Sequence, residues 1–263
     1  NIKRNRTERN QEQHIFRVFI MKIIDCHAHI GKEGDKNIDL AKIKIHLKRN
    51  KINKVVLFPF ISDTLTQDSL KILELSKKNK FIIPFIRFNP NTITKKELEK
   101  LLDNPFKGVK LHPRAEKFNP LDQKFDWIFK EIQKHNIPIL FHCKSYHFDP
   151  DSHPEKILKL AKRHPKQIFI LGHFAGVNKE LFKEYVKQKN IYVETSIDVT
   201  PNAYREVVLK YGFKRLLFGT DFPYSFGEIE LMKLKFANLG NEMEERILYK
   251  NAENLLNKQS KNF

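Results

Sequence analysis

The stretch "MKIIDCHAHIG", residues 21–31, places two histidines two residues apart where an apolar run gives way to polar residues. Side chains at positions i and i+2 of a strand point to the same side, so His27 and His29 are expected on one face. Cys26 and Ala28 then take the other face. Two imidazoles at a strand end can hold one metal ion when other elements supply the remaining ligands. On this stretch alone, an ordinary pair of structural histidines is an equal alternative.

The rest of the chain repeats a short β-branched or aromatic run followed by an amphipathic helix pattern. The expected strands are 22–27, 54–59, 81–88, 108–113, 137–143, 168–173, 191–196 and 215–223. The expected helices are 39–50, 68–79, 94–104, 125–136, 154–164, 178–190, 202–212 and 241–258. Eight such units over about 240 residues predict an α/β fold, a (β/α)8 TIM barrel, whose usual length is about 250 residues. An open doubly wound sheet is the alternative, but it normally carries a Gly-rich phosphate turn, and no G-x-G-x-x-G motif occurs in the sequence.

The chain is strongly basic, with 49 Lys and Arg against 31 Asp and Glu and a formal net charge of +18. Because the lysines are spread over nearly every helical segment, we attribute this charge to composition and expect no nucleic-acid partner. The 22 phenylalanines can fill a sizeable core, and two cysteines cannot make a disulfide framework. No apolar run approaches the ~20 residues that span a bilayer, so no membrane partner is expected.

Residues 1–20, "NIKRNRTERNQEQHIFRVFI", are polar and basic up to the short run "IFRVFI". That run is too brief and too interrupted for the apolar core of a signal peptide, which takes about 7–15 residues. Met21 directly precedes the first expected strand and fits a natural start. We therefore expect residues 1–20 to form a flexible extension, residues 21–263 to form a single barrel domain, and the protein to be cytoplasmic.

Imidazoles, carboxylates and one lysine gather at the predicted strand ends, where barrel enzymes collect their catalytic groups. In chain order these residues are His27, His29, Lys110, His112, His142, His173, Glu194 and Asp221. A lone histidine is most often structural, but several that converge on one barrel mouth beside a carboxylate favour a metal site.

At these positions the sequence resembles the amidohydrolase superfamily. Within it, the resemblance is to the amidohydrolase-related group (amidohydrolase 2) that includes aminocarboxymuconate semialdehyde decarboxylase. The motifs that carry it run from residue 25 to 256 and are "DCHAH", "GVKLHP", "LFHC", "ILGHFAG", "LLFGTDFP" and "ILYKNAENLL". H-x-H alone is a weak signal. H-x-H followed by His, His and Asp, at the first, fifth, sixth and eighth strands, is specific.

The resemblance implies a barrel of the metallo-dependent hydrolase type with a divalent metal, usually Zn²⁺, with Mn²⁺ as the alternative ion. The ligands that it implies are His27, His29, His142 and Asp221. Asp221 would also take a proton from the metal-bound water, and His173 would contact that water or the substrate. We favour one metal ion per chain.

Lys110 leaves a binuclear site open, because binuclear members carry a carboxylated lysine or a glutamate bridge near this position. His173 would then bind the second metal. In the mononuclear arrangement that we favour, Lys110 and His112 line the substrate pocket. Arg87 and Arg114 are candidate ligands of a substrate carboxylate, although ion pairs with neighbouring loops explain them equally well.

Our leading hypothesis is a metal-dependent hydrolase that cleaves an amide, ester or lactone-like bond in a small molecule. Non-oxidative decarboxylation at the same metal site is the alternative. A TatD-like nuclease or a nucleic-acid binder is less favoured, since TatD-like enzymes usually carry a glutamate where this chain has "GVKLHP". The expected partner is a small-molecule substrate, and a homo-oligomer stays open.

Overall fold

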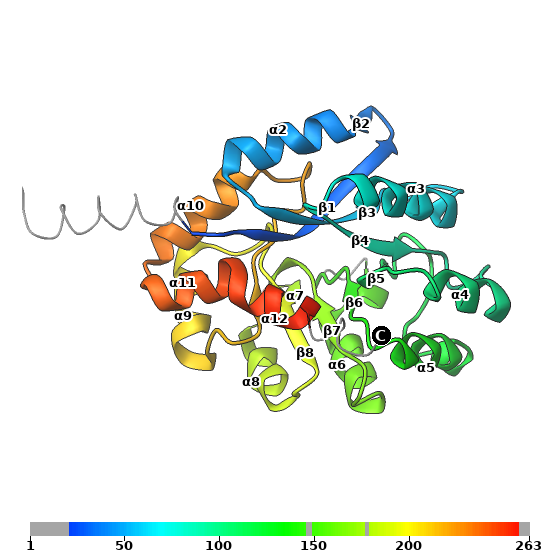
Figure 1. The fold of residues 1–263 in the computed structure, drawn as a ribbon. Helices are drawn as coiled ribbons and strands as arrows, with labels where there is room; N and C mark the ends of the chain where they lie inside the picture. Colours follow the sequence, from blue (N-terminus) through cyan, green and yellow to red (C-terminus); the bar gives the residue numbers. More distant parts are fainter. Residues whose placement is uncertain (1–20, 146–148, 177–178, 258–263) are drawn as a thin grey trace, which may run out of the picture.

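Strands and helices alternate along most of the chain (Figure 1). The computed structural model describes residues 21–145, 149–176 and 179–257, so the predicted extension of residues 1–20 lies outside it. The strands are β1 Ile24–Glu33, β2 Lys36–Ile38, β3 Lys54–Pro59, β4 Ile82–Arg87, β5 Gly108–Leu111, β6 Ile139–Phe141, β7 Phe169–Leu171, β8 Ile191–Glu194 and β9 Leu216–Leu217. The α-helices are α2 Leu40–Asn50, α3 Leu65–Lys78, α4 Lys95–Leu102, α5 Asp126–Lys134, α6 Pro154–Arg163, α7 His173–Gly176, α8 Lys179–Lys187, α9 Pro201–Tyr211, α10 Gly227–Ala237, α11 Asn241–Glu245 and α12 Asn251–Asn257.

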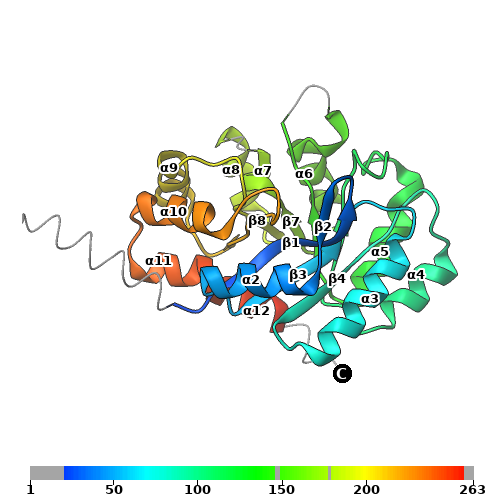
Figure 2. The same cartoon turned by 90° about the horizontal axis from the view of Figure 1, so that it is seen from above.

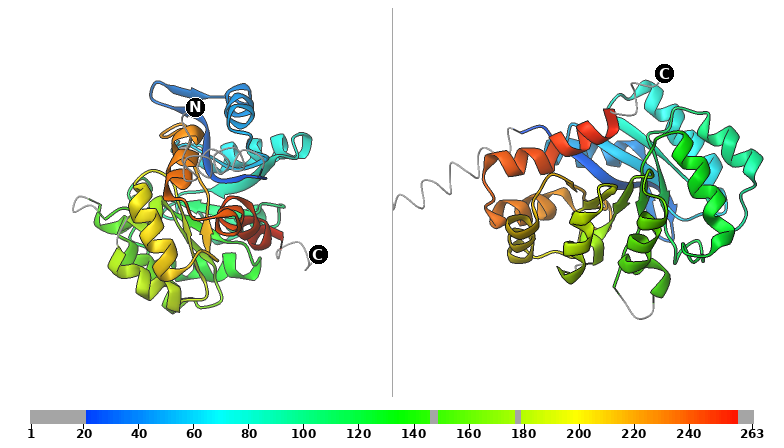
Figure 3. Two further views of the ribbon diagram at one scale, coloured as in Figure 1. Left: turned by 90° about the vertical axis from the view of Figure 1, so that its left-hand side faces the viewer. Right: turned by 90° about the horizontal axis from the view of Figure 1, so that it is seen from below.

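The strands form one curled sheet in the order β2-β1-β3-β4-β5-β6-β7-β8-β9. Every pairing from β1 to β9 is parallel, and only β2 is antiparallel to its neighbour. The helices lie around the outside of the curl (Figures 2 and 3). Backbone hydrogen bonds also join β1 to residues 218–222, including Cys26 N to Phe218 O at 2.9 Å and His29 N to Phe222 O at 2.8 Å. The parallel strand–helix alternation is thus as predicted.

The first strand is longer than predicted. It runs to Glu33. The two histidines therefore lie inside the strand, whereas we had expected the strand to end at His27. A two-residue turn, Gly34-Asp35, leads back into β2, which the sequence analysis missed. Gly34 has φ +54°, a left-handed conformation that glycine adopts easily and that two-residue hairpins require. The helix α10 (Gly227–Ala237) was also missed.

A β-bulge overturns the predicted alternation of side chains along β1. The pairing of β1 with β3 shifts register between Asp25 and Ala28. An extra residue in a strand breaks strict alternation, so neighbouring side chains can lean to the same side. Cys26 accordingly belongs to the apolar cluster inside the curl, although His27 also faces inward, against the ring of Phe58. Ala28 alone takes the outer face as predicted.

Two apolar layers hold the fold together. The larger one lies between the sheet and the surrounding helices. The smaller one fills the inside of the curl and includes Ile24, Leu140, Ile170 and Leu217, with Leu255 of α12 packed against it. Among the described residues, no helix has the length and apolar character that crossing a bilayer requires.

Candidate metal centre

Three of the four predicted ligands meet where β1 passes the segment that follows β9. His27 Nε2 and His29 Nε2 each lie 3.0 Å from Asp221 Oδ1. Asp221 follows β9. A backbone hydrogen bond fixes its position beside β1, because the Asp221 N–H donates to the His27 carbonyl at 2.7 Å. Its φ of +56° is left-handed, a conformation that aspartate adopts more readily than most non-glycine residues.

The buried carboxylate of Asp25 anchors this arrangement from the outer side. It accepts hydrogen bonds from the Thr220 N–H at 2.9 Å and the Thr220 hydroxyl at 2.6 Å. It also accepts the His27 N–H at 3.0 Å. Asp25 therefore clamps β1 to the segment that carries Asp221.

Glu194 orients the His27 ring from the opposite side. Its Oε2 lies 2.8 Å from His27 Nδ1, which places the proton of the neutral ring on Nδ1 and leaves the lone pair of Nε2 facing Asp221. Gly219 makes room for this carboxylate, since a Cβ there would lie 2.0 Å from Glu194 Oε1. The glycine of "FGTD" is thus required by close packing around Glu194.

The donor set of this group fits a divalent ion. One nitrogen of His27, one of His29 and one oxygen of Asp221 lie within 4.8 Å of one another and are buried. Acceptor atoms that converge in a dry site repel one another unless a proton or a cation lies among them. Two imidazoles and a carboxylate are ligands that zinc and manganese both accept.

The pKa values of these residues reflect burial beside opposite charges. Burial lowers the pKa of His29 to about 3, so this ring is neutral at pH 7. Burial and Lys110 lower the pKa of His27, but Asp221 and Glu194 outweigh them, and the value lies above the ordinary one. Burial raises the pKa of Asp221, but the facing histidines outweigh it and hold the value well below the usual range. Asp221 is therefore an ionised acceptor at neutral pH.

His173 is carried by a strained turn after β7. His173, Phe174 and Ala175 have φ of +53°, +52° and +52°. Successive left-handed L-residues are rare, because each costs roughly 1–2 kcal/mol. The turn directs His173 over the site, with Nδ1 3.1 Å from Ser196 Oγ and Nε2 2.9 Å from His142 Nδ1. His173 also forms a second group of potential ligands with His27 and Glu194.

His142, the fourth predicted ligand, falls in neither of the two groups that the described residues form. Its ring is stacked on that of His112, with centroids 3.7 Å apart. Its Nε2 is buried without a hydrogen-bond partner, and so is Oδ2 of Asp149, 3.9 Å away. His142 contacts His173, which belongs to the second of these groups.

Lys110 lies beside the candidate ligands. Its Nζ is 3.2 Å from His27 Nε2 and 5.0 Å from the centroid of the Phe58 ring. Burial lowers its pKa to about 8, against the raising effect of Asp221. The ammonium form can hold an anion here, and the neutral amine is also accessible near physiological pH.

The two arginines predicted to bind a substrate carboxylate lie in different environments. Arg87 is buried, with Nε 2.8 Å from Glu116 Oε1 and Nη1 3.1 Å from the Pro59 carbonyl. Arg114 has a side chain that is 52 % exposed, and its Nε lies 3.7 Å from Asp149. Only Arg114 of these two presents its charge to solvent.

Sequence reasoning missed several polar residues that support the site. They are Ser196, Thr220 and Asp149, together with the aromatic residues Phe60 and Tyr224, whose rings pack on His29 with centroids 5.0 Å and 5.4 Å away. Ser196 could have been found, because it lies two residues after Glu194 and its hydroxyl donates to Oε2 of that residue at 3.0 Å. Thr220 belongs to the motif "LLFGTDFP" and directly precedes Asp221. The contacts of Asp149, Phe60 and Tyr224 depend on loop conformations that carry no motif.

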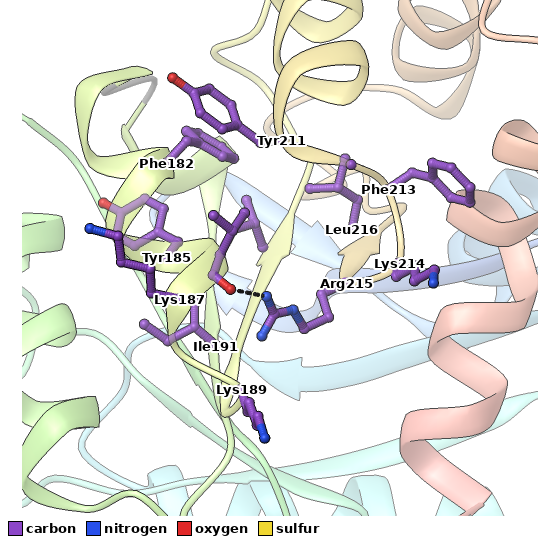
Figure 4. A pocket seen from close by; sticks show the side chains of 13 residues that line it. Phe182, Tyr185, Lys187, Lys189, Ile191, Tyr211, Phe213, Lys214, Arg215 and Leu216 are labelled. Atoms are coloured by element: carbon purple, nitrogen blue, oxygen red, sulfur yellow. Dashed lines mark hydrogen bonds between the residues drawn. The ribbon is translucent and has the colours of Figure 1, made fainter.

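A cavity of about 610 Å³ lies elsewhere, beside the amino ends of β8 and β9 (Figure 4). Its apolar side chains include Phe182, Ile191 and Leu216. Arg215 lies at its edge and donates to the Val186 carbonyl at 2.8 Å, at the end of α8. None of the predicted site residues lines this cavity.

Comparisons with known proteins agree with this fold. The Amidohydro_2 family model, described as amidohydrolase, matches residues 24–258. None of the curated proteins compared with the chain matches it. An uncharacterized TIM-barrel protein, Bb4693, from Bordetella bronchiseptica is 17 % identical with a TM-score of 0.77, covering 92 % of this chain and 100 % of that one.

Two enzymes of different reaction types share the fold. A dihydroxybenzoic acid decarboxylase from Polaromonas sp. JS666, solved with manganese and the inhibitor 2-nitroresorcinol, is 15 % identical (TM-score 0.74; 90 % of this chain and 97 % of that chain). A probable 2-pyrone-4,6-dicarboxylic acid hydrolase from Acinetobacter baumannii, with citric acid bound, is also 15 % identical (TM-score 0.70; 90 % and 100 %). Since the family match spans most of the sequence, the chain belongs to the amidohydrolase family.

Proposed function

We propose that this protein is a divalent-metal-dependent enzyme acting on a small molecule at the mouth of a (β/α)8 barrel, which closes between β1 and residues 218–222. The observation that carries the proposal is the buried convergence of acceptor atoms from His27, His29 and Asp221. These three residues would hold the ion, with His142 as the fourth ligand. Zn²⁺ is the ion that we expect, with Mn²⁺ as the alternative.

Hydrolysis is the first reaction that we propose. An ion bound here would lower the pKa of a coordinated water towards neutrality and polarise a substrate carbonyl. Asp221 is ionised at neutral pH, so its carboxylate can accept the proton of the attacking water and pass it to the leaving group. His173, held by Ser196, would orient the water or the substrate from the side. Lys110 would stabilise negative charge on the substrate.

Decarboxylation is the second reaction, and one observation favours it. Cationic groups suited to a carboxylated substrate flank the candidate ligands, with Lys110 beside His27 and Arg114 exposed to solvent. The decarboxylase from Polaromonas has the same fold and binds manganese. In this reaction Lys110 and Arg114 would hold the substrate carboxylate, and Asp221 would carry the proton that replaces it.

Metal analysis tests the site. Wild-type protein purified without chelator should contain about one divalent ion per chain, and His27→Asn should lose most of it. His135→Asn is the matched control, because His135 is only partly buried, at the end of α5, and should keep the metal. Failure of wild-type protein to bind zinc or manganese would refute the proposal. Two ions per chain would favour the binuclear arrangement with Lys110 and His173.

A substrate screen separates the two reactions. Small carboxylated esters, lactones and hydroxybenzoates would be offered to protein reconstituted with zinc or with manganese. Release of carbon dioxide identifies decarboxylation, whereas release of a new carboxylate or alcohol without carbon dioxide identifies hydrolysis. Any activity should disappear on chelation and return when the metal is restored.

A further inference from the structure

Two buried polar atoms face each other beside the candidate metal centre. His142 Nε2 and Asp149 Oδ2 lie 3.9 Å apart, and neither forms a hydrogen bond with any of the described residues. The separation is too long for a direct hydrogen bond, which brings a nitrogen donor to within about 3.2 Å of its acceptor. Buried polar groups are paired in most proteins, so this nitrogen and this oxygen require an explanation.

The carboxylate of Asp149 is held in place by its other contacts. Asp149 is 1 % exposed, and its Oδ1 accepts the Ser152 N–H at 3.2 Å. It is the N-cap residue of the short 3₁₀ helix Pro150–Ser152. Arg114 Nε lies 3.7 Å from Oδ2, so a positive charge faces the same oxygen as the His142 ring. Oδ2 is therefore an anionic acceptor at a fixed position.

Hydrogen bonds around His173 determine which nitrogen of His142 carries the proton. The Ser196 hydroxyl donates to Glu194 Oε2 at 3.0 Å, so its oxygen accepts from His173 Nδ1 at 3.1 Å. A neutral imidazole with its proton on Nδ1 has an acceptor at Nε2. His142 Nδ1, 2.9 Å from His173 Nε2, must then be the donor. The Nε2 lone pair of His142 therefore faces the Asp149 carboxylate, and two acceptors cannot form a hydrogen bond.

His142 must carry its proton on the other nitrogen to act as the fourth metal ligand. Its Nδ1 lies on the side of His173, and its Nε2 lies on the side of Asp149. Nδ1 is therefore the atom that would coordinate the ion, and a coordinating imidazole nitrogen carries no proton. The neutral ring then loses a proton from Nδ1 and gains one on Nε2, so its charge does not change.

Asp149 provides the acceptor that this form of His142 needs. Histidine ligands almost always donate their second ring N–H to a carboxylate, a carbonyl or water, and this contact fixes the orientation of the ring. We propose that Asp149 Oδ2 accepts the His142 Nε2–H in the metal-bound protein and thereby positions His142 as a ligand. A shift of about 1 Å brings the two atoms within hydrogen-bond distance. This role rests on the proposed function, in which His142 is the fourth ligand.

Metal affinity tests the role of Asp149. In Asp149→Leu, which removes the acceptor, the dissociation constant for zinc or manganese should rise about 10–100-fold in competition with a chromophoric chelator. Asp149→Asn keeps a neutral oxygen that can accept the N–H, so the rise should be smaller. Asp151→Ala is the matched control. Asp151 lies in the same short helix but pairs with Lys156 at 2.6 Å, so this variant should keep the wild-type affinity.

The possible outcomes separate this role from a structural one. Wild-type affinity in a folded Asp149→Leu variant would overturn the proposal, and a lower melting temperature beside it would show that Asp149 only caps the short helix. If Asp149→Leu does not fold, an unchanged affinity in Asp149→Asn would overturn the proposal. Wild-type protein that binds neither zinc nor manganese would refute the proposed function, and this role with it.

The position of the His142 proton gives a spectroscopic test. In protein with ¹⁵N-labelled histidine, long-range ¹H–¹⁵N spectra distinguish rings protonated on Nδ1 from rings protonated on Nε2. The His142 signal, assigned by its loss in His142→Asn, should report a proton on Nδ1 without metal and on Nε2 with zinc. The Nε2–H should exchange with water slowly in the wild-type zinc protein and faster in Asp149→Leu. Zinc coordination through Nε2, or an exchange rate that the substitution leaves unchanged, would overturn the proposal.

Discussion

The two ends of the same parallel strands have opposite chemistry. Near their amino ends the inside of the curl is apolar, with Ile24, Leu140 and Leu217 at most 2 % exposed. At the carboxyl ends it is filled by equally buried titratable groups, among them His27 and Asp221. The (β/α)8 barrel that we propose would separate stability from function along the strand direction. The difference predicts that substitutions at one end cost stability and that those at the other end cost activity.

The carboxyl end also contains the strained backbone. His173 and Asp221 both have left-handed φ, and both lie in segments that follow a strand. The apolar end and the surrounding helices must offset the free energy of this strain and of the buried charges. The following substitutions test that division, beginning with the one that should change the rate most.

Asp221→Asn should have the largest effect. The amide keeps the size and one neutral oxygen but cannot accept the proton, so turnover of an identified substrate should fall at least about 10⁴-fold. Metal content should be lower but not lost, and the unfolding midpoint should change little. Steady-state kinetics and metal analysis measure the two effects. Wild-type turnover by this variant would show that the proton goes elsewhere.

His173→Asn should reduce the rate by about 10²–10⁴-fold, the usual range for a lost acid–base group. His173 touches Ser196 and His142 and would act beside the metal, so about one ion per chain should remain. Ser196→Ala should reduce the rate by a smaller factor, because it removes only the hydrogen bond that orients the His173 ring. Complete loss of metal in His173→Asn would make this residue a ligand.

Leu140→Ala at the apolar end should cost about 2–5 kcal/mol of unfolding free energy, because a fully buried leucine is replaced by a cavity. Its effect on the catalytic constants of the folded protein should be small. Urea unfolding measures the loss, and Leu70→Ala is the exposed control, expected to cost well under half as much. Equal losses in the two variants would contradict the role of the inner apolar cluster.

The sequence was sufficient for what depends on periodicity and on strand order. Eight strands, most of their helices and the meeting of His27, His29 and Asp221 follow from runs, spacings and the rule that strand ends share one edge, whereas α10 and β2 were missed. The β-bulge in β1, the left-handed turn at His173 and the orientation of the His142 ring depend on local backbone geometry. Loop residues such as Asp149 contact site residues that are distant in the sequence, and no periodic pattern encodes such contacts.

The stability of metal-free protein should fall as the pH decreases from about 6.5. Burial lowers the pKa values of His29, His112, His142 and His173 below their ordinary values. In that range the unfolded chain binds these protons and the folded chain does not, so the unfolding free energy decreases by up to about 1.4 kcal/mol per pH unit for each group. Glu116 and Glu230, whose pKa values are raised, oppose the trend at the lower end of this range. The pKa of His27 is raised above 6.5, so its contribution to the slope lies above this range. Urea midpoints at several pH values measure the slope, and His112→Asn should make it shallower.

Arg114→Ala should have the smallest effect of these substitutions. It compares an exposed arginine with a buried one, Arg87, near the carboxyl ends of the strands. Arg114 is half exposed and can hold a substrate carboxylate, so its loss should raise KM about three- to tenfold with little change in stability. Arg87→Ala is the contrasting variant. It leaves Glu116 buried without its cation, which typically costs about 3–5 kcal/mol of unfolding free energy. If Arg114→Ala left KM unchanged while a folded Arg87→Lys variant raised it, the buried arginine would be the one that reaches the substrate.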